Sequence, residues 1–283
     1  MIIRNPRNLP EALVRAVSWA TYKPNPMRMS VTDLIGSPLA RSLKHKFYDQ
    51  LEADVEDMTW AMLGTAFHML MDKNAPAGSH SEKKIELVID GYTLVGIPDI
   101  HQDGTLDDYK TTSVFSFKLG DKPDWERQLN VYRYMILKDK GIEIKKLRIV
   151  AILRDWMKSK TKSDKDYPKY PLIVVDIPIW PIEYTEMYIF DRLEIHKTLA
   201  ECTPEERWRR PTVYAVKKKG IKTSKRNLDS MEMAEAWIAK NTKENERKLY
   251  TIDVRPGEDS KCLDYCSVAK WCPCNIYNKE AKE

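Results

Sequence analysis

The feature that most constrains the fold of this chain is a short hairpin that runs into an acidic residue. Two stretches of strand-forming residues, Ile85 to Ile89 and Thr93 to Ile97, flank the dipeptide Asp90-Gly91. This dipeptide favours a tight turn between antiparallel strands. The second stretch continues into Gly96-Ile97-Pro98-Asp99. The sequence therefore predicts a carboxylate, that of Asp99, at the end of a strand.

A second turn follows and leads to two more charged residues. Gln102-Asp103-Gly104 precedes an expected strand from Thr105 to Lys110, which we expect to run antiparallel to the strand that ends near Asp99. Asp108 and Lys110 are two positions apart and therefore project from the same face of that strand. Two facing carboxylates bind a hard divalent cation, and a nearby ammonium can orient a water molecule or steady phosphate charge.

This arrangement resembles the PD-(D/E)XK nuclease superfamily, whose pattern is an acid, a short hairpin and then acid-x-Lys. Upstream, Gly64-Thr65-Ala66-Phe67-His68 is similar to the G-x-x-x-H helix motif of the RecB-like branch, in which the histidine is a metal ligand. Downstream, Gln128-Leu129-Asn130-Val131-Tyr132 is similar to the Q-x-x-x-Y helix motif of the same branch. All of these elements occur in the family's order.

The resemblance implies a fold and a chemistry. The fold would be α/β, with a restriction-endonuclease-like core in which a mixed sheet of about five strands is flanked by helices. The function would be that of a metal-dependent deoxyribonuclease, an exonuclease acting on DNA ends in recombination, repair or phage replication. Mg²⁺ or Mn²⁺ would be bound by His68, Asp99, Asp108 and the carbonyl of Tyr109. Lys110 would orient the attacking water, while Gln128 and Tyr132 would position the metal site and the DNA backbone.

Several of these residues also have plainer interpretations. A single histidine on an apolar helix such as Trp60 to Met71 is commonly a core residue, and Asp107-Asp108 alone would suggest a solvated turn. Gln128 and Tyr132 share one face of the expected helix Trp125 to Leu137, where they could be an exposed amide and a half-buried phenol.

Two further acids lie near the motif, and three other functions remain open. Glu82 and Glu86 could contribute to the site, although we expect Glu86 to face solvent or to pair with a lysine. A structure-specific DNA endonuclease and a non-catalytic DNA-binding assembly factor of the same fold are alternatives. RNA is a possible substrate, because metal-assisted phosphodiester chemistry is the same on both polymers.

With 283 residues, the chain is long enough for one large domain and a small appendage. We expect a nuclease core with a helical N-terminal segment and accessory elements at 1–255, and a cysteine-rich tail packed on it at 256–283. No apolar run approaches the roughly 18 residues of a membrane span, and Met1 to Pro10 lack the apolar stretch of a signal peptide. The sequence therefore predicts a cytoplasmic protein, which includes a phage protein acting in its host, with DNA and not a membrane as its partner.

Lysines gather in two segments, although the net charge of the chain is only +5. The first segment holds Lys158, Lys160 and Lys162, and the second holds Lys217, Lys218, Lys219 and Lys222. Clusters of this kind are often solvated loops. Beside a metal-dependent nuclease core, we expect them to contact the phosphates of a nucleic acid. Near the second segment, Tyr214 to Val216 and Tyr250 to Val254 are expected strands that flank a helix from Ser230 to Ala239.

Four of the five cysteines are crowded near the C-terminus, at positions Cys262, Cys266, Cys272 and Cys274. Crowded thiols in an intracellular protein are more often metal ligands than disulfides. Their spacing is similar to the tail of RecB-like nucleases that carry a four-iron cluster, such as the AddB-type and CRISPR-adaptation nucleases. In those proteins one cysteine upstream of the core joins three in the tail.

This chain departs from that pattern because no cysteine precedes His68. The fourth ligand must come from elsewhere. We expect Cys202, which follows a predicted helix from Pro181 to Ala200, and not Cys274, which lies only one residue beyond Cys272. Cys202, Cys262, Cys266 and Cys272 would bind a structural 4Fe-4S cluster, with Zn²⁺ as the alternative because thiolates suit both. Free surface thiols are a third interpretation.

Overall fold

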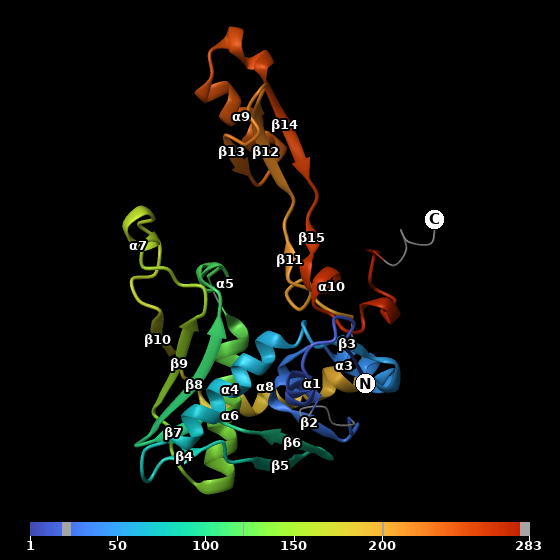
Figure 1. The fold of residues 1–283 in the computed structure, drawn as a ribbon, viewed down its shortest axis with the longest axis vertical. Helices are drawn as coiled ribbons and strands as arrows, with labels where there is room; N and C mark the ends of the chain where they lie inside the picture. Colours follow the sequence, from blue (N-terminus) through green and yellow to red (C-terminus); the bar gives the residue numbers. More distant parts are fainter. Residues whose placement is uncertain (19–23, 121, 200, 278–283) are drawn as a thin grey trace. The chain divides into compact units, whose positions relative to one another are not determined.

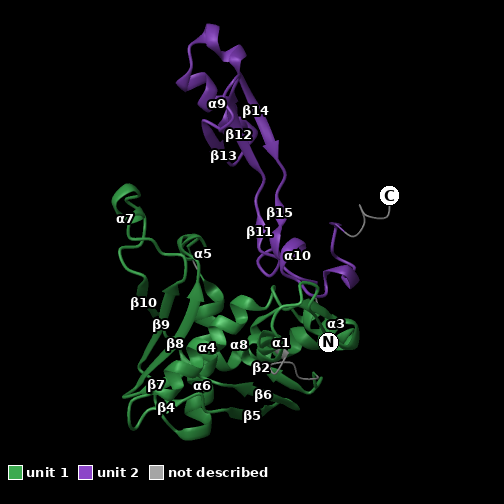
Figure 2. Ribbon diagram, in the orientation of Figure 1, with its two compact units in different colours: residues 1–200 green, residues 201–283 purple. Residues whose placement is uncertain are grey.

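The chain divides into two units, residues 1–200 and 201–283 (Figure 2). The computed structural model describes residues 1–18, 24–120, 122–199 and 201–277. The sequence predicted a boundary at 255/256. The expected tail, 256–283, instead falls within the second unit, together with the elements from 201 onward. Its last residues, 278–283, lie outside the described part.

Unit 1 is built on a mixed sheet flanked by helices, which confirms the α/β class predicted from the sequence (Figure 1). Within the described residues the sheet has five strands in the order β10-β9-β8-β7-β4. β8 and β9 run parallel, and the other neighbouring pairs are antiparallel. The strands are β4 (His80–Ser81), β7 (Ile100–Gln102), β8 (Thr105–Thr112), β9 (Lys146–Leu153) and β10 (Leu172–Ile177).

The two expected turns are confirmed, but the first hairpin belongs to another sheet. β5 (Ile85–Ile89) and β6 (Tyr92–Gly96) are antiparallel, and β2 (Arg28–Ser30) runs parallel to β6 on its other side. At the turn, Asp90 and Gly91 have φ values of 49° and 79°, as a two-residue hairpin of this type requires. The turn between β7 and β8 likewise has positive φ values at its two central residues, Asp103 and Gly104. Asp99 therefore lies in the link between two sheets.

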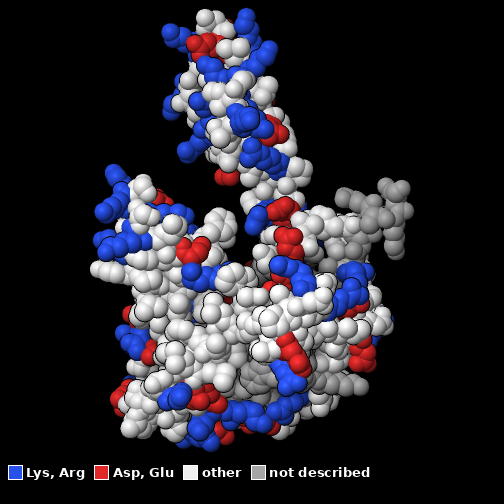
Figure 3. Space-filling view, viewed as in Figure 1, with Lys and Arg blue, Asp and Glu red and all other residues white. Residues whose placement is uncertain are grey.

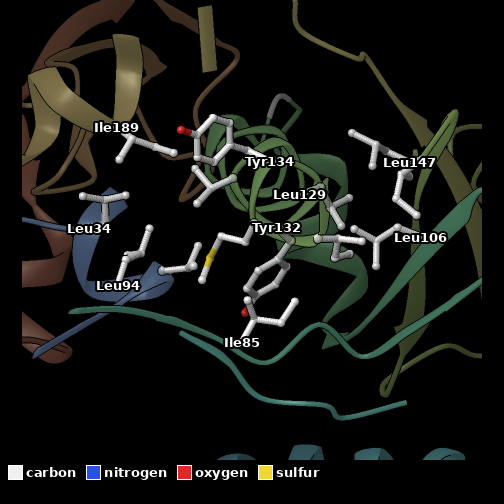
Figure 4. Packing of buried hydrophobic residues seen from close by; sticks show 14 of the residues in the cluster. Leu34, Ile85, Leu94, Leu106, Leu129, Tyr132, Tyr134, Leu147 and Ile189 are labelled. Atoms are coloured by element: carbon white, nitrogen blue, oxygen red, sulfur yellow. The ribbon is translucent and has the colours of Figure 1, made fainter. Parts of the chain in front are cut away.

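Helix α6 (Pro123–Lys140) lies at the centre of the unit 1 core. Proline at its start, acids in its first turn and a left-handed Gly141 at its end are the capping features of a stable helix. Figure 4 shows buried side chains around this helix, with Leu129 pointing toward Leu106 of β8 and Tyr132 toward Ile85 of β5. One helix thus packs against both sheets.

The remaining elements of unit 1 surround this core. They are β1 (Ile2–Arg4), α1 (Glu11–Ser18), α2 (Val31–Ile35), α3 (Pro38–Lys46), β3 (Glu52–Asp54), α4 (Thr59–Lys73), α5 (Val114–Lys118), α7 (Lys160–Ser163) and α8 (Ile182–Thr198). The helices expected near Trp60 and Trp125 are confirmed as α4 and α6. α8 confirms the helix expected from Pro181, although Ala200, its expected last residue, lies outside the described residues.

Unit 2 contains a small antiparallel sheet in the order β13-β12-β14, with α9 (Met231–Asn241) against all three strands. The strands are β12 (Val213–Lys218), β13 (Arg226–Leu228) and β14 (Tyr250–Arg255). β11 (Arg209–Arg210) pairs with β15 (Glu258–Asp259), and α10 (Ser260–Asp264) follows. Buried apolar side chains are few in the described part of this unit: Ala215, Val216, Ala234 and Val268. No helix in the described residues is long and apolar enough to span a bilayer.

Candidate active site

Three residues from separate elements of unit 1 meet beside the central sheet. His68 comes from α4, Glu82 follows β4, and Asp99 precedes β7. Nδ1 of His68 lies 3.2 Å from Oε1 of Glu82 and 3.3 Å from Oδ1 of Asp99. One ligand atom from each residue lies within 4.8 Å of the other two. In the described part of the chain, this is the group of three His, Cys, Asp or Glu residues whose ligand atoms lie within that distance of one another.

Strand pairing fixes the relative positions of the two acids. β4 pairs with β7 so that Ser81 lies opposite Ile100, and the N–H of Glu82 donates to the carbonyl oxygen of Asp99 at 2.9 Å. Glu82 has a φ of 48°, a left-handed conformation that is uncommon outside glycine. Such backbone strain is concentrated at functional sites. The fold therefore holds the Glu82 carboxylate beside that of Asp99.

A second acid and a lysine lie on the neighbouring strand, β8. The N–H of Tyr109 donates to Oδ2 of Asp99 at 2.6 Å. Asp108 is only 1% exposed, and Nζ of Lys110 lies 2.7 Å from its Oδ2. This contact is a buried ion pair, in which the ammonium of Lys110 lies against the Asp108 carboxylate. A buried carboxylate of this kind needs a positive charge beside it, which is here the ammonium of Lys110.

The electrostatics of these residues also fit a bound cation. Hydrogen bonds to Asp99 and Glu82 raise the pKa of His68 to about 10, so its imidazolium form offsets part of the negative charge of the two carboxylates at neutral pH. Burial raises the pKa of Asp108 to about 6, although Lys110 opposes this shift. Imidazole nitrogen and carboxylate oxygens are suitable ligands for Mn²⁺, and carboxylates suit Mg²⁺. A divalent cation could replace the proton of His68 as the positive charge of the site.

Helix α6 contributes a polar pair next to the acids. Nε2 of Gln128 donates to the Tyr132 hydroxyl at 3.1 Å. The Tyr132 ring is buried, and its burial raises the pKa of the phenol, helped by the negative charges of Asp108 and Asp99. The two motif residues on α6 are therefore close to each other, and the phenol is within electrostatic reach of the acids.

A pocket of about 410 Å³ borders Tyr132 on the side of β2 and β6. Arg28, Ser30 and Thr32 supply polar groups to its lining, and Val95 and Ile97 supply apolar ones. Ser30 and Asp33 form a reciprocal capping box at the start of α2, which fixes this wall. The sequence patterns gave no indication of this pocket, because its lining comes from segments far apart in the chain.

The expected ligand set and the observed geometry differ at one position. His68 and Asp99 lie together, whereas Asp108 is paired with Lys110 and Glu82 completes the close group. Glu86 pairs with Lys84 at 2.7 Å and with Arg28, in line with its expected role. Tyr109 contributes its N–H to Asp99, and the use of its carbonyl as a ligand stays a prediction.

All five cysteines lie in unit 2 and are half-buried. Burial raises the pKa of the Cys262 thiol to about 11, with smaller contributions from Asp259 and from the three thiols expected to share its metal, Cys266, Cys202 and Cys272. Burial also raises the pKa of Cys274 to about 11, and that thiol is hydrogen-bonded to Glu201. Within the described residues no three sulfur atoms come within 4.8 Å of one another. The cluster and its fourth ligand stay predictions.

The structure places the two lysine clusters in different units. Lys158, Lys160 and Lys162 lie around α7 in the connection between β9 and β10 of unit 1, where their side chains are exposed. The second cluster lies at the end of β12 in unit 2. Lys217 and Lys218 pair with Asp253 and Glu246, at 2.6 and 3.6 Å. Lys219 and Lys222 are exposed.

No protein-family model matches the sequence, and a search of curated proteins found no match. Among solved structures, one described as SSO0001 is 16% identical and aligns with a TM-score of 0.48 over 69% of this chain and 88% of its own. The alkaline exonuclease LHK-Exo from Laribacter hongkongensis is 11% identical, with a TM-score of 0.39 over 67% of this chain and 93% of its own. Similarities at this level leave the chemistry to be argued from the residues themselves.

Proposed function

We propose that this chain is a divalent-metal-dependent DNA nuclease that acts as an exonuclease on free ends. The observation that carries the proposal is the meeting of His68, Glu82 and Asp99 beside the buried ion pair of Asp108 and Lys110. Cation ligands and an ammonium group within one small region are what metal-assisted phosphodiester hydrolysis requires. The preference for free ends rests on the resemblance of the motifs to RecB-like nucleases.

Each residue has a defined part in this proposal. His68, Glu82 and Asp99 hold Mg²⁺ or Mn²⁺, and Asp108 and the Tyr109 carbonyl are the further oxygen donors. A bound cation of this kind stabilises negative charge on the phosphate and lowers the pKa of a bound water. Lys110 presents its ammonium group, which can donate a hydrogen bond to the attacking water or to a phosphate oxygen.

The residues on α6 support this arrangement from one side. Gln128 orients the Tyr132 hydroxyl through its hydrogen bond. With a raised pKa, this phenol stays protonated and can donate a hydrogen bond to a phosphate oxygen. Gln128 and Tyr132 thus act as positioning residues for the site and the DNA backbone.

The test is cleavage of labelled linear and circular DNA by purified full-length protein with Mg²⁺, Mn²⁺ or a chelator. We expect linear DNA to be degraded only when metal is present, and the variants His68→Ala and Asp99→Asn to lose this activity. Degradation in chelator, or unchanged activity of both variants, contradicts the proposal. Equal cleavage of circular DNA would assign an endonuclease, and preferred cleavage of RNA would assign a ribonuclease. Tight DNA binding without cleavage under either metal would assign a binding factor.

We further propose that Cys202, Cys262, Cys266 and Cys272 hold a structural 4Fe-4S cluster in unit 2. The half-buried thiols interact electrostatically with one another, and their thiolate forms need a cation because burial disfavours the unpaired charge. Four thiolates leave no open position for substrate, so the role is structural. Anaerobically purified protein should be brown, whereas colourless protein with bound zinc would assign the same ligands to Zn²⁺.

A further inference from the structure

The positive charge of this protein is concentrated in one part of unit 2. Residues 211–257 contain eleven Lys and Arg against six Asp and Glu, a net charge of +5. The complete chain also has a net charge of +5, so the rest of the molecule is neutral in sum. Figure 3 shows basic side chains gathered over the part of unit 2 that holds α9 and β12 to β14. We call residues 211–257, which form this small sheet and helix, the basic lobe.

The hairpin that joins β12 to β13 carries several basic side chains for which no ion pair occurs in the described part of the chain. Lys217 and Lys218, at the end of β12, are paired with acids. Beyond them the chain turns at Gly220, which has a φ of 84°. Four exposed basic residues flank this turn, Lys219 before Gly220 and Lys222, Lys225 and Arg226 after it. In the described part of the chain no ion pair involves any of these four.

The fold of the basic lobe explains why these charges stay exposed. α9 packs against all three strands, and Val216 of β12 is completely buried. The alternate residues of the ladder, Lys217 and Asp253, form an ion pair on the other, polar face of the sheet. The loop between β12 and β13, residues 219–225, carries Lys219, Lys222 and Lys225, whose side chains are exposed. Four unpaired cations so close together repel one another unless an anion lies among them.

The composition of the lobe indicates which anion it suits. A surface that binds single-stranded nucleic acid needs exposed aromatic rings on which bases stack. Tyr214, Trp237 and Tyr250 of the lobe are all half-buried, and its exposed large apolar residues are Ile221, Met233 and Val254. Without an exposed ring in this lobe, contact through phosphates is favoured. Phosphate charge is most dense along a double helix, with one charge for about 1.7 Å of its axis.

We propose that the β12–β13 hairpin binds the phosphate backbone of double-stranded DNA, independently of the metal centre in unit 1. The choice of DNA rests on the proposed function. The binding is insensitive to sequence and sensitive to salt, because each lysine or arginine that contacts a phosphate releases condensed counterions. An exonuclease with this element would grip the duplex through a unit separate from the one that cleaves it.

The experiment measures binding of full-length protein to a labelled duplex in chelator, so that metal-dependent cleavage plays no part. The hairpin variant changes Lys219, Lys222, Lys225 and Arg226 to Gln. The control variant changes Lys138, Lys140, Lys145 and Lys146 of unit 1 to Gln, which lowers the net charge equally. Those four lysines are paired with acids at 3.4, 2.9, 3.7 and 3.2 Å. The single variant Lys222→Glu, within the loop and outside any strand, is a second test that leaves the sheet intact.

We expect the hairpin variant to bind the duplex at least about tenfold more weakly at moderate salt. The slope of its log affinity against log salt concentration should be less negative by about 3 to 4, the value for four lost phosphate contacts. The control variant should stay within about threefold of wild type, and single-stranded DNA of equal length should compete poorly. Two results would overturn the proposal. One is an equal loss of duplex affinity in the hairpin variant and the control variant, and the other is an unchanged affinity in both the hairpin variant and Lys222→Glu.

Two further outcomes separate this inference from its alternatives. Vesicles of phosphatidylcholine with phosphatidylserine serve as the competing anionic surface. If wild type binds these vesicles through the hairpin and the duplex is unaffected by the variants, the partner is a membrane and the inference is wrong. If duplex binding depends on the hairpin but the protein cleaves DNA with neither Mg²⁺ nor Mn²⁺, the inference stands and the proposed nuclease function fails.

Discussion

The two candidate metal sites differ in how much of their geometry the polypeptide supplies by itself. In unit 1, one ligand atom each from His68, Glu82 and Asp99 already lies within 4.8 Å of the other two. In unit 2, the four expected cysteines influence the charge of one another, yet within the described residues no three of their sulfurs are so close. The fold therefore brings the first group of side chains together, whereas a shared metal at the four cysteines stays a proposal.

The elements that carry the two sites explain this difference. In unit 1, His68 comes from the 15-residue helix α4, and the short pair of β4 and β7 holds Glu82 and Asp99 at the edge of the sheet that contains the eight-residue strands β8 and β9. In unit 2, Cys262 lies on the five-residue helix α10, and Cys272 directly follows a three-residue turn of 3₁₀ helix at Ala269–Trp271. The other cysteines lie in loops and turns. A small unit with few buried apolar residues commonly depends on a bound metal for its stability.

The largest effect is expected from changes to the ion pair on β8. Lys110→Ala and Asp108→Asn should each lower the cleavage rate by roughly a thousandfold or more, because the ammonium or the buried acid is lost from the site. Asp107→Asn is the matched control. Asp107 is the adjacent residue, but it points to the opposite face and pairs with Arg148 at 2.5 Å. The assay is single-turnover cleavage at saturating Mg²⁺, and comparable losses in Asp107→Asn and Asp108→Asn would contradict this assignment.

A cysteine substitution should affect the two units unequally. In Cys262→Ser, hydrogen exchange in residues 201–277 should accelerate by roughly a hundredfold, since metal binding and folding are coupled in a small unit. Exchange in unit 1 should change little, and so should the cleavage rate. The comparison variant is Cys274→Ser, which should keep its metal. Loss of metal in Cys274→Ser but not in Cys202→Ala would show that Cys274 is the fourth ligand.

Two glycines test how tightly unit 1 is packed around its site. A Cβ on Gly96 would lie 2.9 Å from Sδ of Met135 and 3.1 Å from the ring of Tyr132. Gly96→Ala should therefore destabilise unit 1 by about 1–3 kcal/mol. A Cβ on Gly64 of α4 meets Oγ1 of Thr111 at 3.5 Å, an ordinary contact. Gly64→Ala should leave stability unchanged or raise it by up to about 1 kcal/mol. Urea unfolding measures both, and equal effects would indicate a loosely packed site.

A smaller effect is expected when the pH is lowered, and it should be confined to unit 1, which contains all five histidines. Burial lowers the pKa of His196, whose Nε2 lies 3.1 Å from the carbonyl oxygen of Leu34. The unfolded chain therefore takes up this proton first, near its reference pKa of about 6.5. This part of the stability is present above that value and is lost as the pH falls below it. In chelator, urea unfolding between pH 7.5 and 5 should show a smaller loss for His196→Gln, and an identical loss would rule out His196 as the cause.

Local patterns predicted the unit 1 elements that carry the motif residues. The dipeptides Asp90-Gly91 and Asp103-Gly104 predicted the turns of both hairpins, and apolar periodicity predicted α4 and α6. Glu82 was named from the sequence only as an acid that could contribute to the site. Its place beside Asp99 depends on a two-residue pairing of β4 with β7 that leaves no mark in the sequence. The same holds for unit 2. Two of its strands and helix α9 were expected, whereas β13, which is only three residues long, was not. The joining of these elements into one unit depends on contacts between distant segments.

The central claim is tested most directly by comparing the Mn²⁺ affinity of the variant Glu82→Gln with that of the control variant Glu86→Gln. Both variants remove one negative charge, and the two positions are only four residues apart. Glu82 belongs to the group around His68, whereas Glu86 pairs with Lys84 and Arg28. Titration calorimetry of wild type at pH 7.5 should reveal a Mn²⁺ site that Glu82→Gln weakens by roughly 10- to 100-fold and Glu86→Gln leaves within about threefold. Equal Mn²⁺ affinity in all three proteins would contradict a metal centre built from His68, Glu82 and Asp99.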